Sequence, residues 1–293
     1  LELRKEFNFE NIYSKIVEDS RNDEKFKETG ERENFQQIML EAYKDMDIML
    51  KSYPPNGNSL GIDIYGVRDF LQFFHSENNN EISTCFTLNQ DLFLERAERW
   101  QPLGLESMRY PHKSDDINPE RPIRLPSPEE LDIFKPNCIN MGCFYIKLHG
   151  SHGWVSSDGR SGIVLGLNKP KLINKEPLLR WYFELFNQAI GQPNVKLFIV
   201  GYGFNDEHIN NCLFEAIKKH ENEDKLKIYI VSPEEPADFY ERFVFPKQEG
   251  GVGKAANDKR KLIWESVAGY FPYRLSDIFP ADQSETHIKS DIF

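Results

Sequence analysis

Residues 195–206 read VKLFIVGYGFND, and this stretch decides the fold. Its first half, Val195–Val200, is apolar apart from one lysine and predicts a buried β-strand. The two glycines that follow predict a tight turn, and we expect a helix to begin at Asp206 and to run to Lys219. A strand that leads through a glycine turn into a helix is the repeating unit of a parallel sheet covered by helices.

The same alternation continues on both sides of this stretch. Apolar and β-branched runs predict further strands, and longer segments between them predict helices. Strands that are nearly all apolar and alternate with helices form parallel sheets with both faces covered. We therefore predict an α/β fold, a Rossmann-like parallel sheet flanked by helices, in a single domain over residues 1–293. The other predicted strands cover residues 81–88, 143–148 and 226–231, and the other predicted helices cover residues 91–99 and 178–189.

Two segments depart from this alternation. Residues 1–80 predict a helical segment, in which a polar run over residues 18–24 connects two helices. This segment could be an oligomerisation surface or a covering layer, and we favour the covering layer. Residues 101–136 are rich in proline, which is excluded from helix interiors and central strands, so we predict a long loop that is either a functional flap or an ordinary surface loop. The apolar positions of the two N-terminal helices are Phe9, Ile12, Ile16 and Val17, and then Phe35, Ile38, Met39, Ala42 and Tyr43.

The composition limits the classes of partner and site. The formal net charge of the chain is −11, and an acidic surface repels phosphate backbones, so nucleic acid is not expected as a direct partner. No run of about 18 apolar residues predicts a membrane span, and the charged start does not read as a signal peptide. We expect a cytoplasmic protein with reduced cysteines. Cys138 and Cys143 lack the second cysteine pair that a structural zinc site needs, so no metal is predicted.

Three predicted strands end in polar or glycine residues, at the edge of a parallel sheet where ligands bind. The first ends in Thr87-Leu88-Asn89-Gln90-Asp91. The amide of Asn89 both donates and accepts hydrogen bonds, and it suits a ribose hydroxyl or a water. Asn89 or Asp91 could instead cap the helix that follows, and from these residues alone the capping role is favoured.

The second strand end carries a histidine, and the third carries Gly-x-Gly. His149 follows a buried strand and opens a glycine-rich turn, where it could act as a base near neutral pH or be structural. His152 is placed in the same turn and is the weaker candidate. Gly201 and Gly203 would let backbone amides approach a phosphate or a ribose at the start of a helix, although Asp206 also suits the N-cap of that helix.

Together and in this order, the three motifs resemble those of the sirtuin superfamily, and more closely those of the sirtuin-like NAD-hydrolases of bacterial anti-phage defence. The resemblance covers roughly residues 80–280, and the set of motifs is specific although no single one is. The matching residues are Thr87, Asn89 and Asp91 of a Thr-x-Asn-x-Asp motif, His149, Gly150 and Ser151 of a Leu-His-Gly-Ser segment, the run Gly201–Asp206, and the later segment Ser276–Pro280.

The resemblance implies a role for each of these residues. Asn89 would hold the nicotinamide ribose and the attacking water, and His149 would act as the general base. Asp91 would lie near the nicotinamide amide, with Thr87 in the same cofactor-binding motif. The residues that would bind the adenosine side of NAD are Gly201, Gly203, Phe204 and Asn205, with Ser232 near the adenine ribose.

The resemblance also implies a function. We expect an NAD glycohydrolase that cleaves its substrate NAD to nicotinamide and ADP-ribose, as an NAD-depleting effector of anti-phage defence acting through abortive infection. Such an effector would work as a homo-oligomer or with a partner defence protein. The alternatives are an NAD-dependent protein deacylase, which the lack of paired CxxC motifs disfavours, and a catalytically idle NAD-sensing module of a larger assembly. The family's opening glycine-rich loop, of the type Gly-Ala-Gly-x-Ser, does not occur in residues 1–80, and because the first residue is Leu we expect that the opening strand lies outside this sequence or has been lost.

Overall fold

The chain divides into two compact units. Unit 1 comprises Leu1–Gly57 and Leu71–Phe183, and unit 2 comprises Asn58–Phe70 and Glu184–Phe293. Helices α4 (Ile64–Phe73) and α8 (Pro177–Ile190) contribute residues to both units. The structure is a computed structural model, and it describes residues 9–22, 30–51, 62–73, 83–98, 102–105, 122–135, 143–156, 159, 161–166, 168–220, 225–246 and 254–281.

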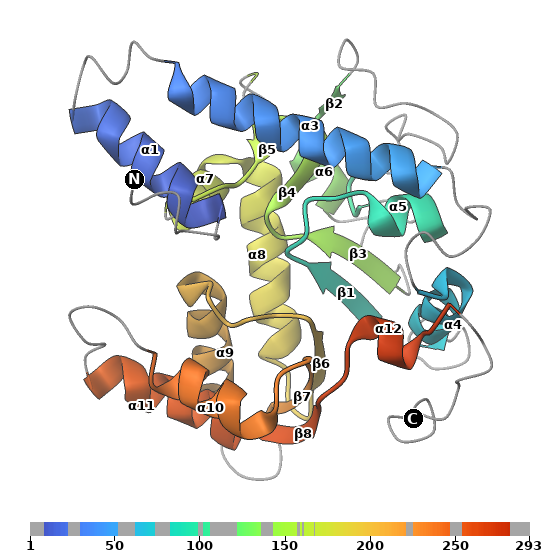
Figure 1. Cartoon of the computed structure of the whole chain (residues 1–293), viewed down its shortest axis with the longest axis vertical. Helices are drawn as coiled ribbons and strands as arrows, with labels where there is room; N and C mark the ends of the chain where they lie inside the picture. Colours follow the sequence, from blue (N-terminus) through green and yellow to red (C-terminus); the bar gives the residue numbers. More distant parts are fainter. Residues whose placement is uncertain are drawn as a thin grey trace. The chain divides into compact units, whose positions relative to one another are not determined.

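Unit 1 begins with two helices, α1 (Phe9–Asn22) and α3 (Glu31–Lys51), drawn in blue in Figure 1. The helices pack against each other, with the rings of Tyr13 and Phe35 5.7 Å apart. The predicted helical segment is thus confirmed where it is described, with two corrections. The polar run predicted as a connection is helical as far as Asn22, and within this helix Lys15 pairs with Asp19 one turn further on, a contact that adds a small stabilisation. Ile38, predicted on the apolar face of its helix, is 61 % exposed.

The strands of unit 1 form two small sheets. Strands β1 (Ser83–Thr87) and β3 (Cys143–Lys147) pair in parallel, as their apolar sequences predict. Strand β4 (Gly150–Val155) pairs in parallel with β2 (Ile123–Arg124) and antiparallel with β5 (Ser161–Ile163). The helices that follow these strands are α5 (Phe93–Glu98), α6 (Pro128–Phe134) and α7 (Lys169–Lys175).

The prediction of a continuous loop over residues 101–136 is wrong where the structure describes this segment. Helix α6 begins with Pro128 in its first turn, where the missing N–H is not needed. Its N-cap residue is Ser127, whose hydroxyl accepts a bond from the amide of Glu130, and the Glu130 carboxylate accepts from the amide of Ser127 at 2.7 Å. Strand β2 lies between prolines instead of containing one, so no ladder bond is lost to them.

Strand β4 (Gly150–Val155) also differs from the prediction. Gly150 and His152 were expected in a glycine-rich turn, but both belong to this strand. Gly150 has φ +74°, and a Cβ atom added there would lie 1.8 Å from the carbonyl oxygen of Gly162 in β5. The glycine is therefore required by the close approach of another strand, a reason that the sequence motif does not distinguish from the approach of a ligand.

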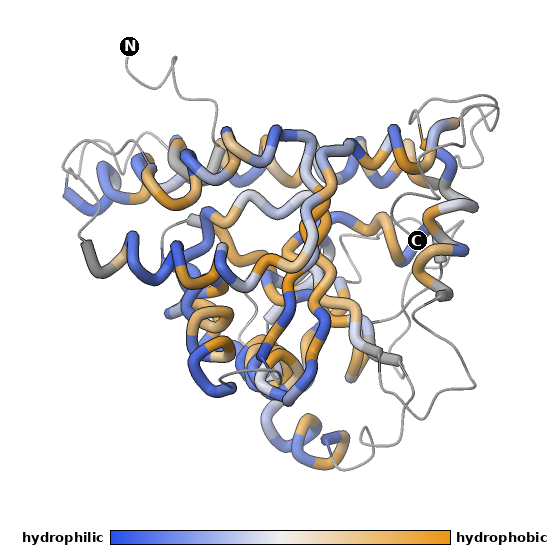
Figure 2. The backbone as a smooth tube through the Cα atoms, turned by 90° about the horizontal axis from the view of Figure 1, so that it is seen from below, coloured by the Kyte–Doolittle hydropathy of each residue, from blue (hydrophilic) through white to orange (hydrophobic). Residues whose placement is uncertain are grey.

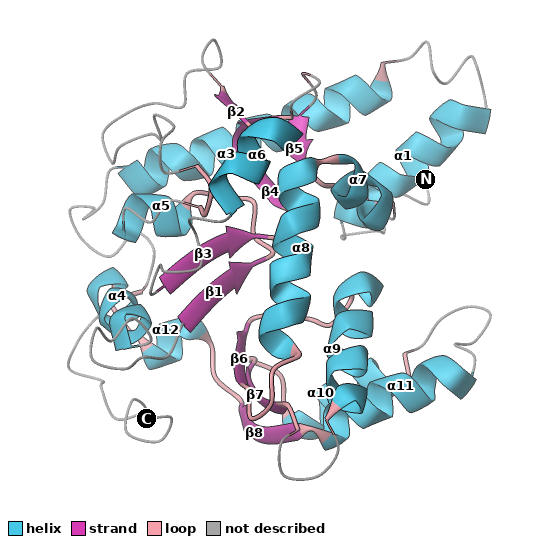
Figure 3. Ribbon diagram, turned by 180° about the vertical axis from the view of Figure 1, so that it is seen from behind, coloured by secondary structure: helices cyan, strands magenta, loops and turns pink. Residues whose placement is uncertain are grey.

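Unit 2 contains a parallel sheet in which β7 (Lys227–Val231) lies between β6 (Lys196–Val200) and β8 (Val267–Phe271). Helix α9 (Glu207–Lys219) connects β6 to β7, and α10 (Pro236–Val244) and α11 (Lys254–Glu265) connect β7 to β8. Figure 3 shows these three helices on one side of the strands. A short helix, α12 (Leu275–Ile278), follows β8.

Helices pack on both faces of this sheet. On one face, the ring of Tyr270 in β8 lies 5.4 Å from that of Phe239 in α10. The next residue, Phe271, points to the opposite face, where Phe198 of β6 lies 6.4 Å from it and 5.8 Å from Phe70 of α4. The predicted α/β class, with parallel sheets flanked by helices, is thus confirmed. That all of residues 1–293 form one domain stays a prediction.

The helices are amphipathic, as helices that cover a core must be. Figure 2 shows hydrophobic and hydrophilic residues alternating along their tubes. Within the described residues, no helix combines the length and the apolar character needed to cross a bilayer.

Candidate functional site

The first group of predicted site residues lies at the carboxyl end of β1 and β3 in unit 1. Thr87 is the last residue of β1 and lies opposite Lys147 of β3. The amide of Leu148 donates to the Thr87 carbonyl at 2.9 Å, so the pairing continues into the segment that leads to His149. Parallel pairing thus brings the ends of these two predicted motifs side by side.

Asn89 is exposed at this edge, directly after β1. Its backbone amide donates to the hydroxyl of Thr87 at 3.0 Å, which folds the segment back on the strand end. This bond uses the backbone of Asn89, so the side-chain amide is presented to solvent with both a donor and an acceptor. The arrangement suits a group that grips a polar ligand.

His149 differs from Asn89 in being buried, with only 3 % of the residue exposed. Its carbonyl oxygen accepts hydrogen bonds from the amide of Val164 at 3.0 Å and from Nε2 of Gln90 at 3.3 Å. The backbone at His149 is therefore held by two further segments, those of Val164 and Gln90.

Asp91 takes the capping role that its sequence position also allowed. Its Oδ1 accepts a hydrogen bond from the amide of Phe93 at 2.8 Å, at the start of α5. Its carbonyl oxygen accepts a bond from Nζ of Lys147. A role for Asp91 near nicotinamide stays a prediction of the resemblance.

Two buried ion pairs lie next to these residues, and the sequence analysis missed both. Nζ of Lys147 lies 2.9 Å from the carboxylate of Glu95, with the two side chains 1 % and 2 % exposed. The guanidinium of Arg96 makes two bonds to Asp47 of α3, at 2.7 and 2.8 Å. Lys147, at the end of an otherwise apolar strand, could have indicated the first of these pairs, because a lysine is buried only when it has a partner of opposite charge.

The second group of predicted residues lies in unit 2, at the carboxyl end of β6 and β7. The amide of Gly201 donates to the Val231 carbonyl at 3.0 Å, and the amide of Ser232 donates to the Phe271 carbonyl at 3.1 Å. Gly201 is exposed and has φ +68°, a conformation that glycine adopts without strain. The strand ends therefore bring Gly201 and the buried Ser232 to one edge of this sheet.

Phe204 in this turn is a core residue. It is 2 % exposed, and its ring lies 4.6 Å from that of Tyr202 and 4.8 Å from that of Phe243. Its φ of +56° is unusual for a side chain of this size, and the Phe204 carbonyl is held by Nδ2 of Asn210 at 2.8 Å. Only the backbone of Phe204 is therefore suited to contact a ligand.

The start of α9 is organised by backbone and phenol groups. Burial raises the pKa of the Tyr202 phenol well above its usual range, so its hydroxyl stays protonated and donates to the Asp206 carbonyl at 3.2 Å. Asp206 occupies the N-cap position but makes no capping bond with its side chain. Asn205 is exposed, and Nδ2 of its side chain would lie 3.3 Å from a Cβ atom on Gly203. Glycine at position 203 thus leaves room for this amide.

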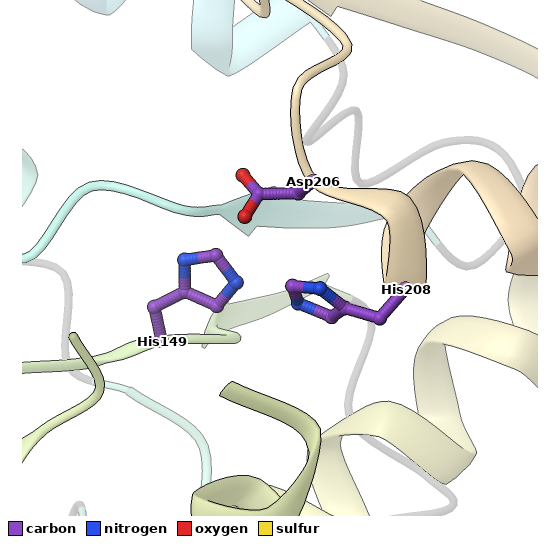
Figure 4. Close-up of side chains that lie close together, drawn as sticks. All are labelled: His149, Asp206 and His208. Atoms are coloured by element: carbon purple, nitrogen blue, oxygen red, sulfur yellow. The ribbon is translucent and has the colours of Figure 1, made fainter. Parts of the chain in front are cut away.

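Figure 4 labels three titratable side chains and shows the elements they come from. His149 follows β3 in unit 1, whereas Asp206 and His208 come from the start of α9 in unit 2. Of the two cysteines considered and set aside as a zinc pair, Cys138 lies outside the described residues and Cys143 is the first residue of β3. The absence of a metal stays a prediction.

The comparisons with known proteins bear on both groups of residues. The chain matches the family model of the SIR2-like domain over residues 83–249, which is more than half of its 293 residues. The chain belongs to the SIR2-like domain family. A search of curated proteins finds no match. The matched segment of this SIR2-like chain contains every predicted site residue, from Thr87 to Ser232.

Membership confirms the resemblance to sirtuins that the motifs indicated. A SIR2-like domain indicates an NAD-utilising enzyme, and the parallel sheets flanked by helices agree with its Rossmann-like fold. Exposed Asn89 and buried His149 follow neighbouring strands, so one amide and one imidazole side chain belong to the same edge of the sheet.

Proposed function

We propose that this SIR2-like chain is an NAD glycohydrolase, which uses water to hydrolyse NAD to nicotinamide and ADP-ribose. The observation that carries the proposal is the pair Asn89 and His149, at the adjoining ends of β1 and β3 inside the family-matched segment. Hydrolysis needs one group that places water and ribose and another that accepts a proton, and this edge provides both.

In the proposed reaction, the bond between ribose C1′ and the nicotinamide nitrogen breaks, and its electron pair leaves with nicotinamide. Positive charge develops on the ribose, and the oxygen of water forms the new bond to C1′. Asn89 orients the ribose and this water through its exposed amide. His149 takes the proton that the water releases, so the products are nicotinamide, ADP-ribose and one proton.

The adenosine part of NAD is assigned to unit 2 by the family resemblance. Backbone N–H groups after a glycine turn at a helix start favour anionic and ribose oxygens. Gly201 and Gly203 occupy such a turn, and Ser232 ends the neighbouring strand. We assign these residues, with Asn205 and the backbone of Phe204, to nucleotide binding.

The biological role belongs to the same proposal. Depletion of NAD by a cytoplasmic hydrolase would end the growth of an infected cell, as in the defence proteins that the motifs resemble. Such an enzyme must be kept inactive until infection triggers it. We propose that a homo-oligomer or a partner defence protein controls its activity. The runner-up is an NAD-dependent deacylase, which the lack of two CxxC pairs among the four cysteines disfavours.

The first prediction tests the proposal with the full chain and NAD. We expect nicotinamide and ADP-ribose to accumulate in equal amounts, measured by liquid chromatography. In the His149→Ala variant we expect kcat to fall by about 10²–10⁴-fold, the range for loss of a general base. The control is His220→Gln, which changes a histidine at the far end of α9.

Each alternative result has a definite meaning. Binding of NAD without release of nicotinamide contradicts the hydrolase and favours the sensing module. Release that requires an acetylated peptide favours the deacylase. Hydrolysis that survives His149→Ala removes His149 from its role as the base.

A further inference from the structure

Gln90 stands between the two motif residues Asn89 and Asp91, and the sequence analysis gave it no role. It is 5 % exposed, so its side-chain amide lies inside unit 1. A buried amide destabilises the fold unless its donors and acceptors are bonded. The partners of this amide therefore show what it does.

The bonds of Gln90 join three separate segments. Its Oε1 accepts from the hydroxyl of Tyr43 in α3 at 2.9 Å. Its Nε2 donates to the carbonyl of Val164 at 2.7 Å and to that of His149 at 3.3 Å. Its own carbonyl accepts from the amide of His152 at 2.8 Å. All the polar groups of the side chain are thus used, and one of them holds the backbone of the proposed base.

We infer that Gln90 is a positioning residue, which fixes the backbone of His149 relative to Asn89 and is itself held by Tyr43 of helix α3. The inference rests on the proposed function, because Asn89 and His149 are the reacting groups it positions. Through Tyr43, helix α3 takes part in the site, although it lies outside the family-matched segment. A displacement of reacting groups by about 1 Å can cost on the order of 10²-fold in rate, so such a support acts on kcat.

The experiment uses two conservative changes in the full chain. Gln90→Met keeps the length of the side chain and removes its hydrogen bonds. Tyr43→Phe removes only the hydroxyl and keeps the ring, which is stacked on His152 with centroids 5.8 Å apart. The matched control is Gln36→Met, because Nε2 of Gln36 donates to the hydroxyl of Tyr13 at 3.0 Å, a bond of the same kind between α3 and α1.

Steady-state kinetics with NAD separates positioning from general stability. For Gln90→Met we expect kcat to fall by about 10- to 100-fold, with KM changed by less than about twofold. Tyr43→Phe should lower kcat by a smaller factor and have no further effect in the Gln90→Met background, because it acts through Gln90. The inference is overturned by an unchanged kcat in Gln90→Met, by independent effects of the two changes, or by an equal loss in Gln36→Met.

A second readout needs no catalysis. The amide of Val164 is bonded to the His149 carbonyl, so its hydrogen exchange reports how firmly this backbone is held. The bond from Gln90 to the His149 carbonyl alone is worth about two- to tenfold in this exchange, so Gln90→Met should speed it by at least this factor, whereas Gln36→Met should not. Unchanged exchange overturns the inference. Faster exchange in a chain that releases no nicotinamide refutes the hydrolase but supports the hold of Gln90 on His149.

Discussion

His152 lies in β4, beside the proposed base, and its ring is buried among charged groups. Burial lowers the pKa of this imidazole; Asp47 opposes the change, and Lys147 and Arg96 add to it. Within the described residues, its Nδ1 has no hydrogen-bond partner. The folded state therefore favours the neutral imidazole of His152, which is stacked on the ring of Tyr43.

The second prediction follows from this lowered pKa. The unfolded chain binds a proton at His152 as the pH falls through about 6.5, whereas the folded chain binds it only at lower pH. The free energy of unfolding should then fall between pH 6.5 and the lowered pKa, by up to about 1.4 kcal/mol per pH unit. Urea unfolding of His152→Phe at several pH values should show a shallower decline, and parallel curves for the two proteins would contradict the assignment.

The third prediction compares two glycines with positive φ. At Gly201 a Cβ atom would meet nothing within 4 Å, so Gly201→Ala should cost only the backbone strain, about 1–2 kcal/mol. At Gly150 the same change also drives a Cβ atom against the carbonyl of Gly162. Gly150→Ala should therefore lower the free energy of unfolding in urea by clearly more, and equal losses would show that β4 and β5 can separate freely.

At the scale of elements, α3 is joined to α5 by a buried charge pair. The guanidinium of Arg96 and the carboxylate of Asp47 are 1 % and 6 % exposed and are bonded in a two-point geometry. Removing one partner leaves the other charged and buried. This pair therefore ties the N-terminal helices to the segment after Asn89.

The fourth prediction measures this connection. Arg96→Met should reduce the free energy of unfolding by about 3–5 kcal/mol, as for other buried pairs that lose one partner. Arg124→Met is the matched control, because Arg124 pairs with Glu130 on the surface, where water screens the two charges and little loss is expected. The double change Asp47→Leu with Arg96→Met should recover part of the loss in urea unfolding, and a loss equal to the control would refute a structural role for the pair.

For the whole molecule, the prediction concerns NAD binding without turnover. In the His149→Ala chain, NAD at about 100 times its Kd should stabilise the folded state by about 2.7 kcal/mol, provided that only the folded state binds it. Thermal unfolding with and without NAD measures this effect, and ADP-ribose is the control ligand that lacks nicotinamide. No shift with either ligand would contradict the assignment of nucleotide binding to this SIR2-like domain.

The secondary structure was predictable where the signal is local. Strands β1, β3, β6 and β7 and helices α8 and α9 begin and end within about two residues of their predicted bounds, because apolar runs and glycine turns act through neighbours in sequence. Helix α6 was missed because Pro128 and the prolines around it were interpreted as helix breakers, although Ser127 and Glu130 form a capping box that the sequence also contains.

The candidate site shows the same division. By itself, the sequence determined that Asn89 and His149 follow two apolar strands, and hence that they stand at the carboxyl edge of parallel strands. Only the tertiary structure decided that Gln90 holds the His149 carbonyl, 59 residues away, and that Arg96 meets Asp47, 49 residues away. The physical reason is that strand formation depends on neighbouring side chains, whereas the partner of a buried polar group is set by which distant segments the packed core brings within hydrogen-bonding distance.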